Sequence, residues 1–497
     1  MSGGEGAGAG HALVAPRRIA AEVVRRVFAE DAFAAAVLSA LLDGAPQLDP
    51  RDRAFATELA YGTLRTARYL EGQLGKLAPR GLSTLDEGTR AHVLVAAYQL
   101  LVLERVPAHA AVNAAVEAIK AHRGQRLASF ANAVLRKLSG DDAKRVDALE
   151  AVRAGAPRWL GRALDRALGA GEGAAFLTAG PVPPPLGLRV RRGDVDASIA
   201  ALVAAHPDAI VSRGRVARAA ILLSGGGDPR RIAGVRAGDL AVQEEGSQAV
   251  AEALGAQPGD VVLDACAGRG NKAILLADAV GASGRVDAAD LHEDKLGRLR
   301  TEAARLGVPL GTSFGVDWTV GTGVVPLGAY DRVLVDAPCS GIGTLRRRPE
   351  ILLKRSEADL ARLATVQRAI VTNAARALKP GGTLVYAVCS VLREEVEGAL
   401  ADLPGLEIET VRRLTPQHDG TDGYSIAHLR ARERLTDRRA KTRATSVCPR
   451  AGTCAELVNR ARYRDGTERG ERRRGGVFHE ERTTRRHAAS GAPLRLR

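Results

Sequence analysis

The chain has 497 residues, enough for two or three domains, and its 45% hydrophobic content includes no run of eighteen apolar residues that could span a membrane. Five cysteines are too few for a disulfide framework, and residues 1–10 lack the segments of a secretion signal, so we expect a protein of the reducing cytosol. The formal charge of +15 includes a surplus of 11 in Arg432–Arg497, with 19 Lys and Arg against 8 Asp and Glu; subtracting it leaves +4 for the first 431 residues.

Residues 16–140 predict helices only. Apolar residues recur at a spacing of three to four over residues 18–28, and Asp49-Pro50 has the N-cap and N1 pattern of a helix start. No segment here reads as a strand, so we expect an all-α domain after a disordered segment, residues 1–15. Its further helices are predicted over residues 53–68, 89–103, 107–120 and 127–138.

Residues 141–239 predict a linker that ends in the stiff segment Pro181–Pro185, followed by a small α/β subdomain. Strands then alternate with helices over residues 240–431, which indicates a parallel, doubly wound sheet. The tail 432–497 loses apolar periodicity, so we expect it to be disordered, and its cysteines lack companions at zinc spacing. The strands are predicted near 261–265, 286–289, 332–336 and 383–388, and the helices at 271–280, 295–306 and 359–378.

A glycine-containing turn follows the first strand of this sheet. Gly268 and Gly270 let the backbone approach a ligand, but a Gly-x-Gly turn is weak evidence because other dinucleotide sites share it. Asp290 ends the next strand, where an acid can bind ribose hydroxyls, although it could merely cap a helix. Asp317 follows a further strand-like segment and could meet an adenine amino group. The residues of an adenosine-containing cofactor site would be Cys266, Ala267, Gly268, Arg269, Gly270, Asn271, Lys272, Asp290 and Asp317.

Two cysteines follow the last two predicted strands in matching Cys-Ser frames. Cys339 and Cys389 should project into one crevice, because ligands bind at the carboxyl ends of the strands in open α/β sheets. With the acid Asp336 nearby, the thiols suggest covalent chemistry on an electrophilic carbon. Cys266 reads better as a small buried core residue. Just after the first frame, Arg346, Arg347 and Arg348 suggest contacts with RNA phosphates over a merely solvated face.

The order of these motifs resembles the Sun/Nop-type RNA (cytosine-5) methyltransferases, in particular those with a NusB-like helical domain that act on 16S rRNA. The resemblance extends over about residues 16–429 and includes N-terminal segments at 55–65, 106–113, 130–136 and 242–248. Two departures stand out: Cys-Ala-Gly-Arg-Gly-Asn-Lys-Ala replaces the usual Cys-Ala-Ala-Pro-Gly-Gly-Lys-Thr, and Val388 stands where threonine commonly precedes the second cysteine.

This resemblance implies a NusB-like RNA-binding domain at 16–140 and a Rossmann-like methyltransferase domain at 240–431 that uses S-adenosylmethionine. It assigns Cys389 as the thiol that attacks C6 of cytosine, Cys339 as the thiol that assists product release, and Asp336 as a hydrogen-bond partner of the cofactor or the base. Lys272 is a candidate for activating Cys389, or else only a solvated residue. We expect a monomer acting on 16S rRNA, with no metal and no membrane.

Three alternatives remain open. The same chemistry could act on tRNA. A DNA cytosine-5 methyltransferase is disfavoured, because those enzymes attack with the cysteine of the Pro-Cys motif and lack a second Cys-Ser site. A catalytically inactive RNA-binding or antitermination module is possible in principle, but the retention of both thiols and of Asp336 counts against it.

Overall fold

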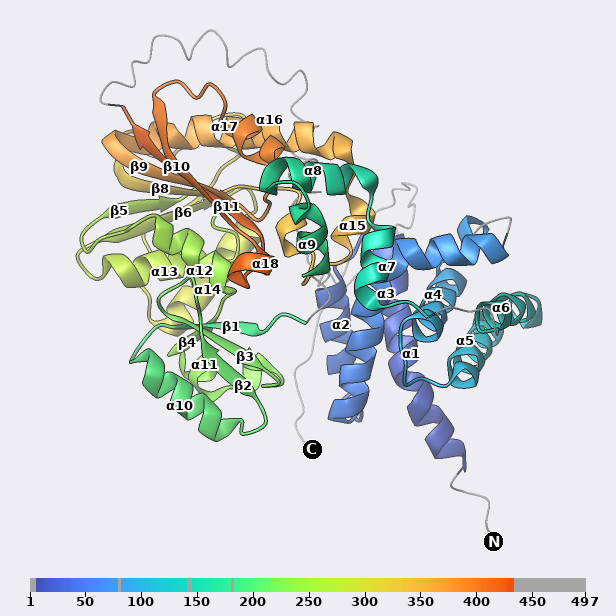
Figure 1. Cartoon of the computed structure of the whole chain (residues 1–497). Coiled ribbons are helices and arrows are strands. Elements are labelled where there is room, and N and C mark those ends of the chain that lie inside the picture. Colours follow the sequence, from blue (N-terminus) through green and yellow to red (C-terminus); the bar gives the residue numbers. More distant parts are fainter. Residues whose placement is uncertain (1–5, 79–81, 141–144, 180–182, 433–497) are drawn as a thin grey trace, which may run out of the picture.

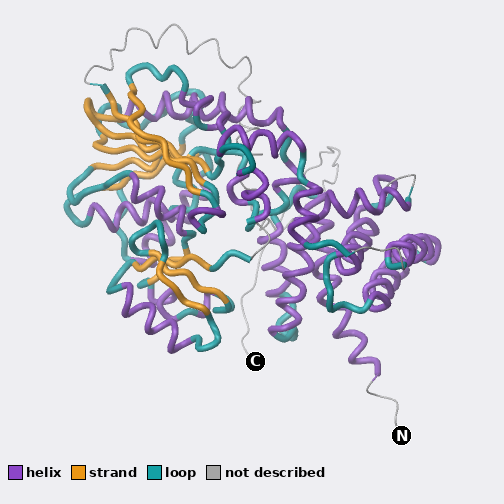
Figure 2. Tube along the Cα trace, in the orientation of Figure 1, coloured by secondary structure: helices purple, strands orange, loops and turns teal. Residues whose placement is uncertain are grey.

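The computed structural model describes residues 6–78, 82–140, 145–179 and 183–432, and its N-terminal part is a domain of packed helices (Figures 1 and 2). Within these ranges no strand precedes residue 186, as the sequence predicts. Buried leucines, valines and alanines from all six helices form one core. The helices are α1 Gly6–Ala29, α2 Ala34–Asp43, α3 Pro50–Leu77, α4 Glu87–Leu101, α5 Ala108–Arg123 and α6 Gln125–Leu138.

Local signals account for how these helices begin and pack. Asp49 caps α3, because its Oδ1 accepts a hydrogen bond from the backbone N–H of Asp52 at 2.7 Å, and Pro50 takes the first helical position. Gly62 lets α3 approach α4 closely: a Cβ at this position would lie 2.1 Å from the ring of Tyr98. The predicted helix start at Asp49-Pro50 is confirmed.

Helix α1 begins at Gly6, within the segment 1–15 for which the sequence predicts disorder. Once the packed part of α1 forms a nucleus, each further residue adds a hydrogen bond at little cost, so the helix extends toward the N-terminus. The charged tail 432–497 lies outside the described residues except for Arg432.

Three helices and a small sheet follow the helical domain. They are α7 Ala148–Gly155, α8 Arg158–Leu168 and α9 Glu172–Thr178, then β1 Leu186–Val190, α10 Val195–Ala205, β2 Ile210–Arg213, β3 Ala220–Ser224, α11 Ala233–Ala237 and β4 Leu240–Val242. The sheet has the strand order β2-β3-β1-β4 and is antiparallel throughout. This β-α-β-β-α-β succession is the ferredoxin-like arrangement.

The larger sheet has seven strands in the order β10-β11-β9-β8-β5-β6-β7. Five are parallel, as predicted: β5 Val261–Asp264, β6 Arg285–Asp290, β7 Ser313–Gly315, β8 Tyr330–Asp336 and β9 Leu378–Val388. Two strands beyond those predicted, β10 Leu406–Leu414 and β11 Tyr424–Ala431, are antiparallel, which makes the sheet mixed. The connection between these two strands is shorter than the dozen or so residues that a parallel crossover needs.

Helices cover both faces of this sheet, as expected for a doubly wound fold (Figure 1). On one face Leu263, Val333 and Tyr386 pack against α16, and on the other Val262, Leu334 and Val385 pack against α12 and α13. No helix in the described ranges is long and apolar enough to cross a membrane. The helices are α12 Glu245–Ala253, α13 Asn271–Val280, α14 Glu293–Leu306, α15 Ile351–Lys354, α16 Glu357–Ala374, α17 Glu397–Leu400 and α18 Pro416–Asp419.

The helical domain docks on α15 and the residues just before it. Arg68 of α3 donates from Nε and Nη2 to the Leu352 carbonyl, at 3.1 and 2.9 Å. Lys354 Nζ donates to the carbonyls of Asp31 (2.7 Å) and Ala32 (3.0 Å) and pairs with the Asp31 carboxylate at 2.7 Å. Asp31 has a positive φ of 53°, a conformation that a non-glycine residue rarely adopts. Lys354 therefore holds the turn between α1 and α2.

We expect Lys354→Ala to loosen this docking and to lower the free energy of unfolding by about 2 kcal/mol, because it removes two charge-assisted hydrogen bonds to backbone carbonyls from a largely buried ammonium group. Thermal unfolding and limited proteolysis between the two domains would measure the effect. Lys379→Ala is the matched control, since Lys379 forms a half-exposed pair with Asp331. Equal effects of the two substitutions would contradict the assigned role of Lys354.

Candidate active site

The two cysteines meet at the carboxyl ends of adjacent parallel strands. β8 and β9 pair with Val335 opposite Tyr386 and Asp336 opposite Ala387, so the loops that follow leave the sheet side by side. The Sγ atoms of Cys339 and Cys389 lie 3.1 Å apart, and both thiols are free. Cys339 is buried, whereas Cys389 is partly exposed. The predicted convergence of the two cysteines is therefore observed.

A buried carboxylate fixes both cysteine loops. Glu395 is fully buried and accepts hydrogen bonds from the backbone N–H of Ser340 (2.7 Å), the Ser340 hydroxyl (2.5 Å) and Gln367 Nε2 (3.0 Å). The hydroxyls of Ser340 and Ser390 are 3.4 Å apart. The serine of each Cys-Ser frame is therefore structural. Sequence reasoning assigned no role to Glu395, although its place six residues after Cys389 was a usable signal.

The pKa values of the two thiols are shifted in opposite directions by their surroundings. The Cys339 thiol donates to Cys389, and this hydrogen bond, with burial, raises the pKa of Cys339 well above its ordinary value. The same hydrogen bond lowers the pKa of Cys389; burial and Asp336 oppose the shift, while the positive charge of Arg348 supports it. Of the two thiols, Cys389 is therefore the one that ionises more readily, and a thiolate is more nucleophilic than a thiol.

Lys272 and Asp336 form an ion pair beside these thiols, with Nζ 2.8 Å from Oδ2. Burial opposes the charge of Lys272, but the Asp336 carboxylate outweighs it and raises the pKa of the ammonium group. The ammonium group remains charged close to Cys389, although its direct partner is the carboxylate and not the thiol. Among the described residues no group of three or more His, Cys, Asp and Glu could hold a metal ion.

The glycine turn between β5 and α13 depends on its glycines. Gly268 and Gly270 have positive φ values of 56° and 91°. A Cβ on Gly270 would lie 2.0 Å from Leu299 Cδ1, whereas nothing lies within 4 Å of one on Gly268. Gly270 is therefore required by packing against α14, and Gly268 leaves open space for a ligand. Around them Ala267 is buried, Arg269 is exposed, and Asn271 Nδ2 contacts the Val242 carbonyl at 3.4 Å.

A cavity of about 330 Å³, which includes open solvent, adjoins this turn and is lined by Cys266, Asp290, Asp317, Trp318 and Pro338. The buried Asp290 carboxylate accepts from the N–H groups of Gly268 (2.9 Å) and His292 (3.0 Å), while Asp317 Oδ1 accepts from the N–H and hydroxyl of Thr319. Of the predicted cofactor residues, Cys266, Asp290 and Asp317 line this cavity, and Gly268 adjoins it through its hydrogen bond to Asp290; the remaining ones do not line it. Cys266 lies in its wall as well as in the core.

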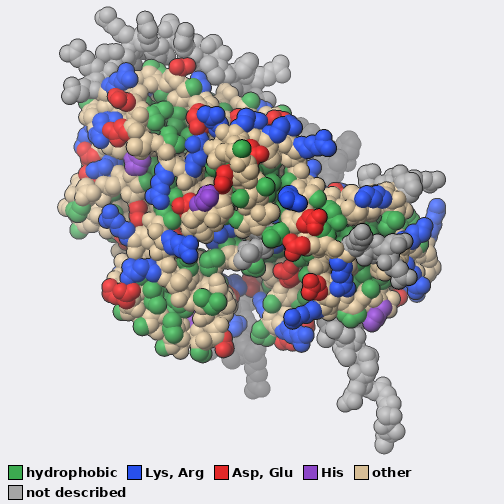
Figure 3. All heavy atoms as spheres, viewed as in Figure 1, with side chains coloured by type: hydrophobic (Ala, Val, Ile, Leu, Met, Phe, Trp, Pro, Cys, Tyr) green, Lys and Arg blue, Asp and Glu red, His purple; other side chains and the backbone are tan. Residues whose placement is uncertain are grey.

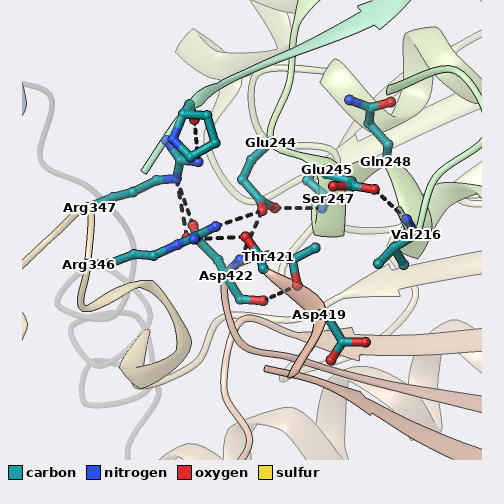
Figure 4. A network of polar contacts seen from close by, with 12 residues as sticks. Val216, Glu244, Glu245, Ser247, Gln248, Arg346, Arg347, Asp419, Thr421 and Asp422 are labelled. Carbon is teal, nitrogen blue, oxygen red and sulfur yellow. Dashed lines mark hydrogen bonds and ion pairs between the residues drawn. The ribbon is translucent and has the colours of Figure 1, made fainter. Parts of the chain in front are cut away.

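Two of the three arginines predicted to contact RNA are engaged within the protein (Figure 4). Arg346 is only 8% exposed and pairs with the buried Asp422, and Arg347 Nε pairs with Asp422 Oδ2 at 3.1 Å. The prediction of phosphate contacts is wrong for Arg346 and unsupported for Arg347. The sequence gives no sign of these ion pairs, because Asp422 lies far from this loop along the chain. Arg348 is partly exposed and acts on Cys389 through its charge.

Comparison with known proteins identifies relatives over most of the chain. Residues 251–404 match the family described as 16S rRNA methyltransferase RsmB/F, and residues 14–140 match the NusB family. A Mycobacterium tuberculosis H37Rv protein with a provisional methyltransferase name is 38% identical over 83% of this chain and 96% of its own. Ribosomal RNA small subunit methyltransferase B of Pseudomonas putida is 32% identical over 83% of this chain and 98% of its own.

The fold is also that of a solved structure. The crystal structure of PH0851 superimposes with a TM-score of 0.73 and 22% sequence identity, over 83% of this chain and 98% of that one. At this identity the likeness concerns the fold alone.

We expect Cys389 to react with iodoacetamide at a lower pH than an ordinary thiol, whose pKa is about 8.5. Because the pKa of Cys389 is lowered from the ordinary value and that of Cys339 is raised, the Cys389 thiolate forms at a lower pH than the Cys339 thiolate. Cys339→Ala removes the thiol donor and should shift the midpoint for Cys389 upward. Mass spectrometry of the two peptides across a pH series measures both midpoints. Faster alkylation of Cys339 than of Cys389 would reverse the assignment.

Proposed function

Because this chain belongs to the RsmB/F family of 16S rRNA methyltransferases and carries a NusB domain, we propose that it methylates C5 of a cytosine in 16S rRNA, with S-adenosylmethionine as the methyl donor. The observation that carries the C5 chemistry is the contact of the Cys339 and Cys389 sulfurs at 3.1 Å, beside the cavity that Pro338 lines.

The residues around the cavity fit an adenosine-containing methyl donor. Gly268 leaves open space at the start of α13, where backbone N–H groups can meet the ligand. Asp290 and Asp317 bring carboxylates to the cavity wall, which suits ribose hydroxyls and an adenine amino group. Arg269, where relatives of the Sun/Nop type carry proline, is exposed, and the positive φ values of this turn belong to Gly268 and Gly270 on either side of it. When bound, S-adenosylmethionine supplies an electrophilic methyl group.

The nucleophile for the pyrimidine ring is the Cys389 thiolate. C5 of cytosine is a poor nucleophile, so the thiolate first adds to C6, which makes C5 enamine-like and able to take the methyl group. Asp336 and Lys272 lie beside the thiols, where the carboxylate can hydrogen-bond the base edge and the ammonium can offset negative charge in the ring. The residues thus provide both the attacking group and its polar surroundings.

The second half of the reaction must remove the C5 proton and free the enzyme. The proton leaves C5 to a base, the electron pair re-forms the C5–C6 double bond, and the C6–sulfur bond breaks to return Cys389 as a thiolate. Cys339 is in contact with the leaving sulfur and is protonated at the start, so it must first release its own proton to solvent; its raised pKa then makes the resulting thiolate a strong base for the C5 proton. We therefore assign Cys339 to this elimination.

A cytosine within a helix cannot reach these thiols, so the target base must leave its stack. Loop or bulge cytosines are the easiest substrates, because their bases are already accessible. We propose that the helical domain 16–140 and the small α/β subdomain within 141–239 hold the RNA, and that the protein acts as a monomer in the cytosol. In Figure 3 basic and acidic side chains are mixed over the visible face, so RNA contacts depend on local clusters and not on total charge.

We expect the protein to form 5-methylcytidine in unmodified 16S rRNA and Cys389→Ala to reduce the rate by roughly 10³-fold or more, as loss of the nucleophile does in other covalent enzymes. Nucleoside mass spectrometry measures the product, and equilibrium dialysis should show unchanged binding of S-adenosylmethionine. Normal turnover by Cys389→Ala would refute the thiol assignment. Methylation of tRNA in place of 16S rRNA would show that tRNA is the substrate. An absence of product on both RNAs would favour a catalytically inactive binding module.

Cys339→Ala should block elimination and therefore trap the protein covalently on the RNA. The adduct would appear as a band of reduced mobility in a denaturing gel and should require both S-adenosylmethionine and a substrate cytosine. The double variant Cys339→Ala/Cys389→Ala is the control, because it lacks the sulfur that forms the bond. An adduct that survives in the double variant, or free turnover by the single variant, would contradict the assigned roles.

A further inference from the structure

A buried charge network joins three segments that are far apart in the sequence (Figure 4). At its centre lies the Asp422 carboxylate, just before β11. It accepts a hydrogen bond from Arg346 Nε, and its two oxygens accept from Arg347 Nε at 3.1 and 3.2 Å. Glu244, just before α12, accepts from the Asp422 N–H at 2.9 Å and lies 3.5 Å from Arg346 Nη2. The side chain of Asp422 is 3% exposed, so these contacts are screened from water.

The arginines extend this network to the backbone on both sides of the Cys339 loop. Arg346 Nη1 donates to the Gly420 carbonyl at 2.8 Å, and Arg347 Nη2 donates to the Pro185 carbonyl at 3.0 Å. The loop that carries the two arginines is therefore tied to the segment before β11 and to the chain that enters β1. Two buried carboxylates face two guanidinium groups, so the charges balance.

Gly343 connects the loop that carries Arg346 and Arg347 to Cys389. Its N–H donates to the Cys389 carbonyl at 3.0 Å, and its own carbonyl accepts from the Gly423 N–H at 2.8 Å. A Cβ on Gly343 would lie 1.8 Å from the Gly423 oxygen and 2.9 Å from the Cys389 oxygen. The loop after Cys339 is therefore packed between Cys389 and Gly423, with no room for a side chain at position 343.

We propose that Asp422 is a positioning residue of the thiol pair: by anchoring Arg346 and Arg347 it holds the Cys339 loop against Cys389 and so sets the contact between the two sulfurs. Asp422 touches neither thiol and acts through the arginines and Gly343. The catalytic meaning of this role rests on the function proposed above. The effect on the sulfurs themselves can be measured without any methyl transfer.

Positioning and simple electrostatics predict opposite outcomes when the charge of Asp422 is removed. Loss of a nearby anion alone would favour the Cys389 thiolate and make this thiol more acidic. Loosening of the loop removes the hydrogen bond from Cys339 and displaces Arg348, which makes Cys389 less acidic. The sign of the change therefore separates the two. The other charged or titratable groups that face Cys389 are Asp336, Lys272, Glu395 and Tyr424.

The test is the pH dependence of iodoacetamide alkylation at Cys389 in the full-length Asp422→Asn variant. We expect the midpoint to rise by about one pH unit, which corresponds to an approximately tenfold slower reaction at neutral pH. Asp422→Glu keeps the charge and should restore part of the wild-type rate. Arg347→Gln, at a less buried position, should also raise the midpoint. Loss of a cation alone predicts the same rise, so in this variant only an unchanged or lowered midpoint discriminates, and that outcome counts against the proposal even if Asp422→Asn does not fold.

Asp260→Asn is the matched control. Asp260 pairs with Arg332 at 2.5 Å and is also largely buried. It precedes β5, at the amino ends of the parallel strands, whereas the two cysteines follow the carboxyl ends. We expect it to lower the midpoint of thermal unfolding while leaving the alkylation midpoint of Cys389 unchanged. This control distinguishes a general loss of stability from a specific effect on the thiols.

An unchanged or lowered alkylation midpoint in Asp422→Asn and Arg347→Gln would overturn the proposal, whatever the loss of stability. An equal rise in Asp260→Asn would overturn it as well. A wild-type protein that shows the lowered Cys389 midpoint but forms no 5-methylcytidine would refute the proposed function instead, and would leave the role of Asp422 in the thiol geometry standing.

Discussion

The register of β8 against β9 determines what this protein can do. These strands are parallel neighbours, and Asp336 pairs with Ala387, so their loops leave the same edge of the sheet at the same level. Cys339 follows Asp336 by three residues and Cys389 follows Ala387 by two. A slip of one residue would turn each side chain to the opposite face and separate the thiols. The core on both faces of the sheet fixes the register, because Val333 and Tyr386 face one layer of helices while Leu334 and Val385 face the other.

Contact between two thiols forces them into different protonation states. Two thiolates at 3.1 Å would repel each other, so one proton is shared, and its location depends on the surroundings. Cys339 is more deeply buried, which disfavours its charge, and Arg348 favours the charge on Cys389. Asp336 would oppose ionisation of both, but Lys272 pairs with it directly. The site thus obtains one nucleophile and one protonated neighbour from two identical side chains.

The sequence allows the parallel strands, the glycine turn and the cysteine pair to be predicted, because each has a local signal: alternation of strands and helices, a Gly-x-Gly turn, and two Cys-Ser frames. Contacts between distant segments are not visible in this way. Arg346 and Arg347 look like a solvated basic cluster until Asp422 is found to lie against them. The strands β10 and β11 are absent from the prediction, and their antiparallel direction depends on how the chain connects them and not on their residues alone.

The docking of the helical domain gives the Cys339 loop a second support. Arg65 Nη2 reaches the Arg346 carbonyl at 3.4 Å, and the Ala34 N–H donates to the buried Glu350 at 3.3 Å. Together with the contacts of Arg68 and Lys354, these bonds fall on residues 346–354, the continuation of the loop that Asp422 anchors. The segment is therefore fixed by the helices on one side and by the segment before β11 on the other. If the helical domain holds the RNA, as we propose, the same segment links the RNA-binding domain to the thiols. A displacement of the helices would then change the position of the Cys339 loop, where we propose that the cytosine reacts.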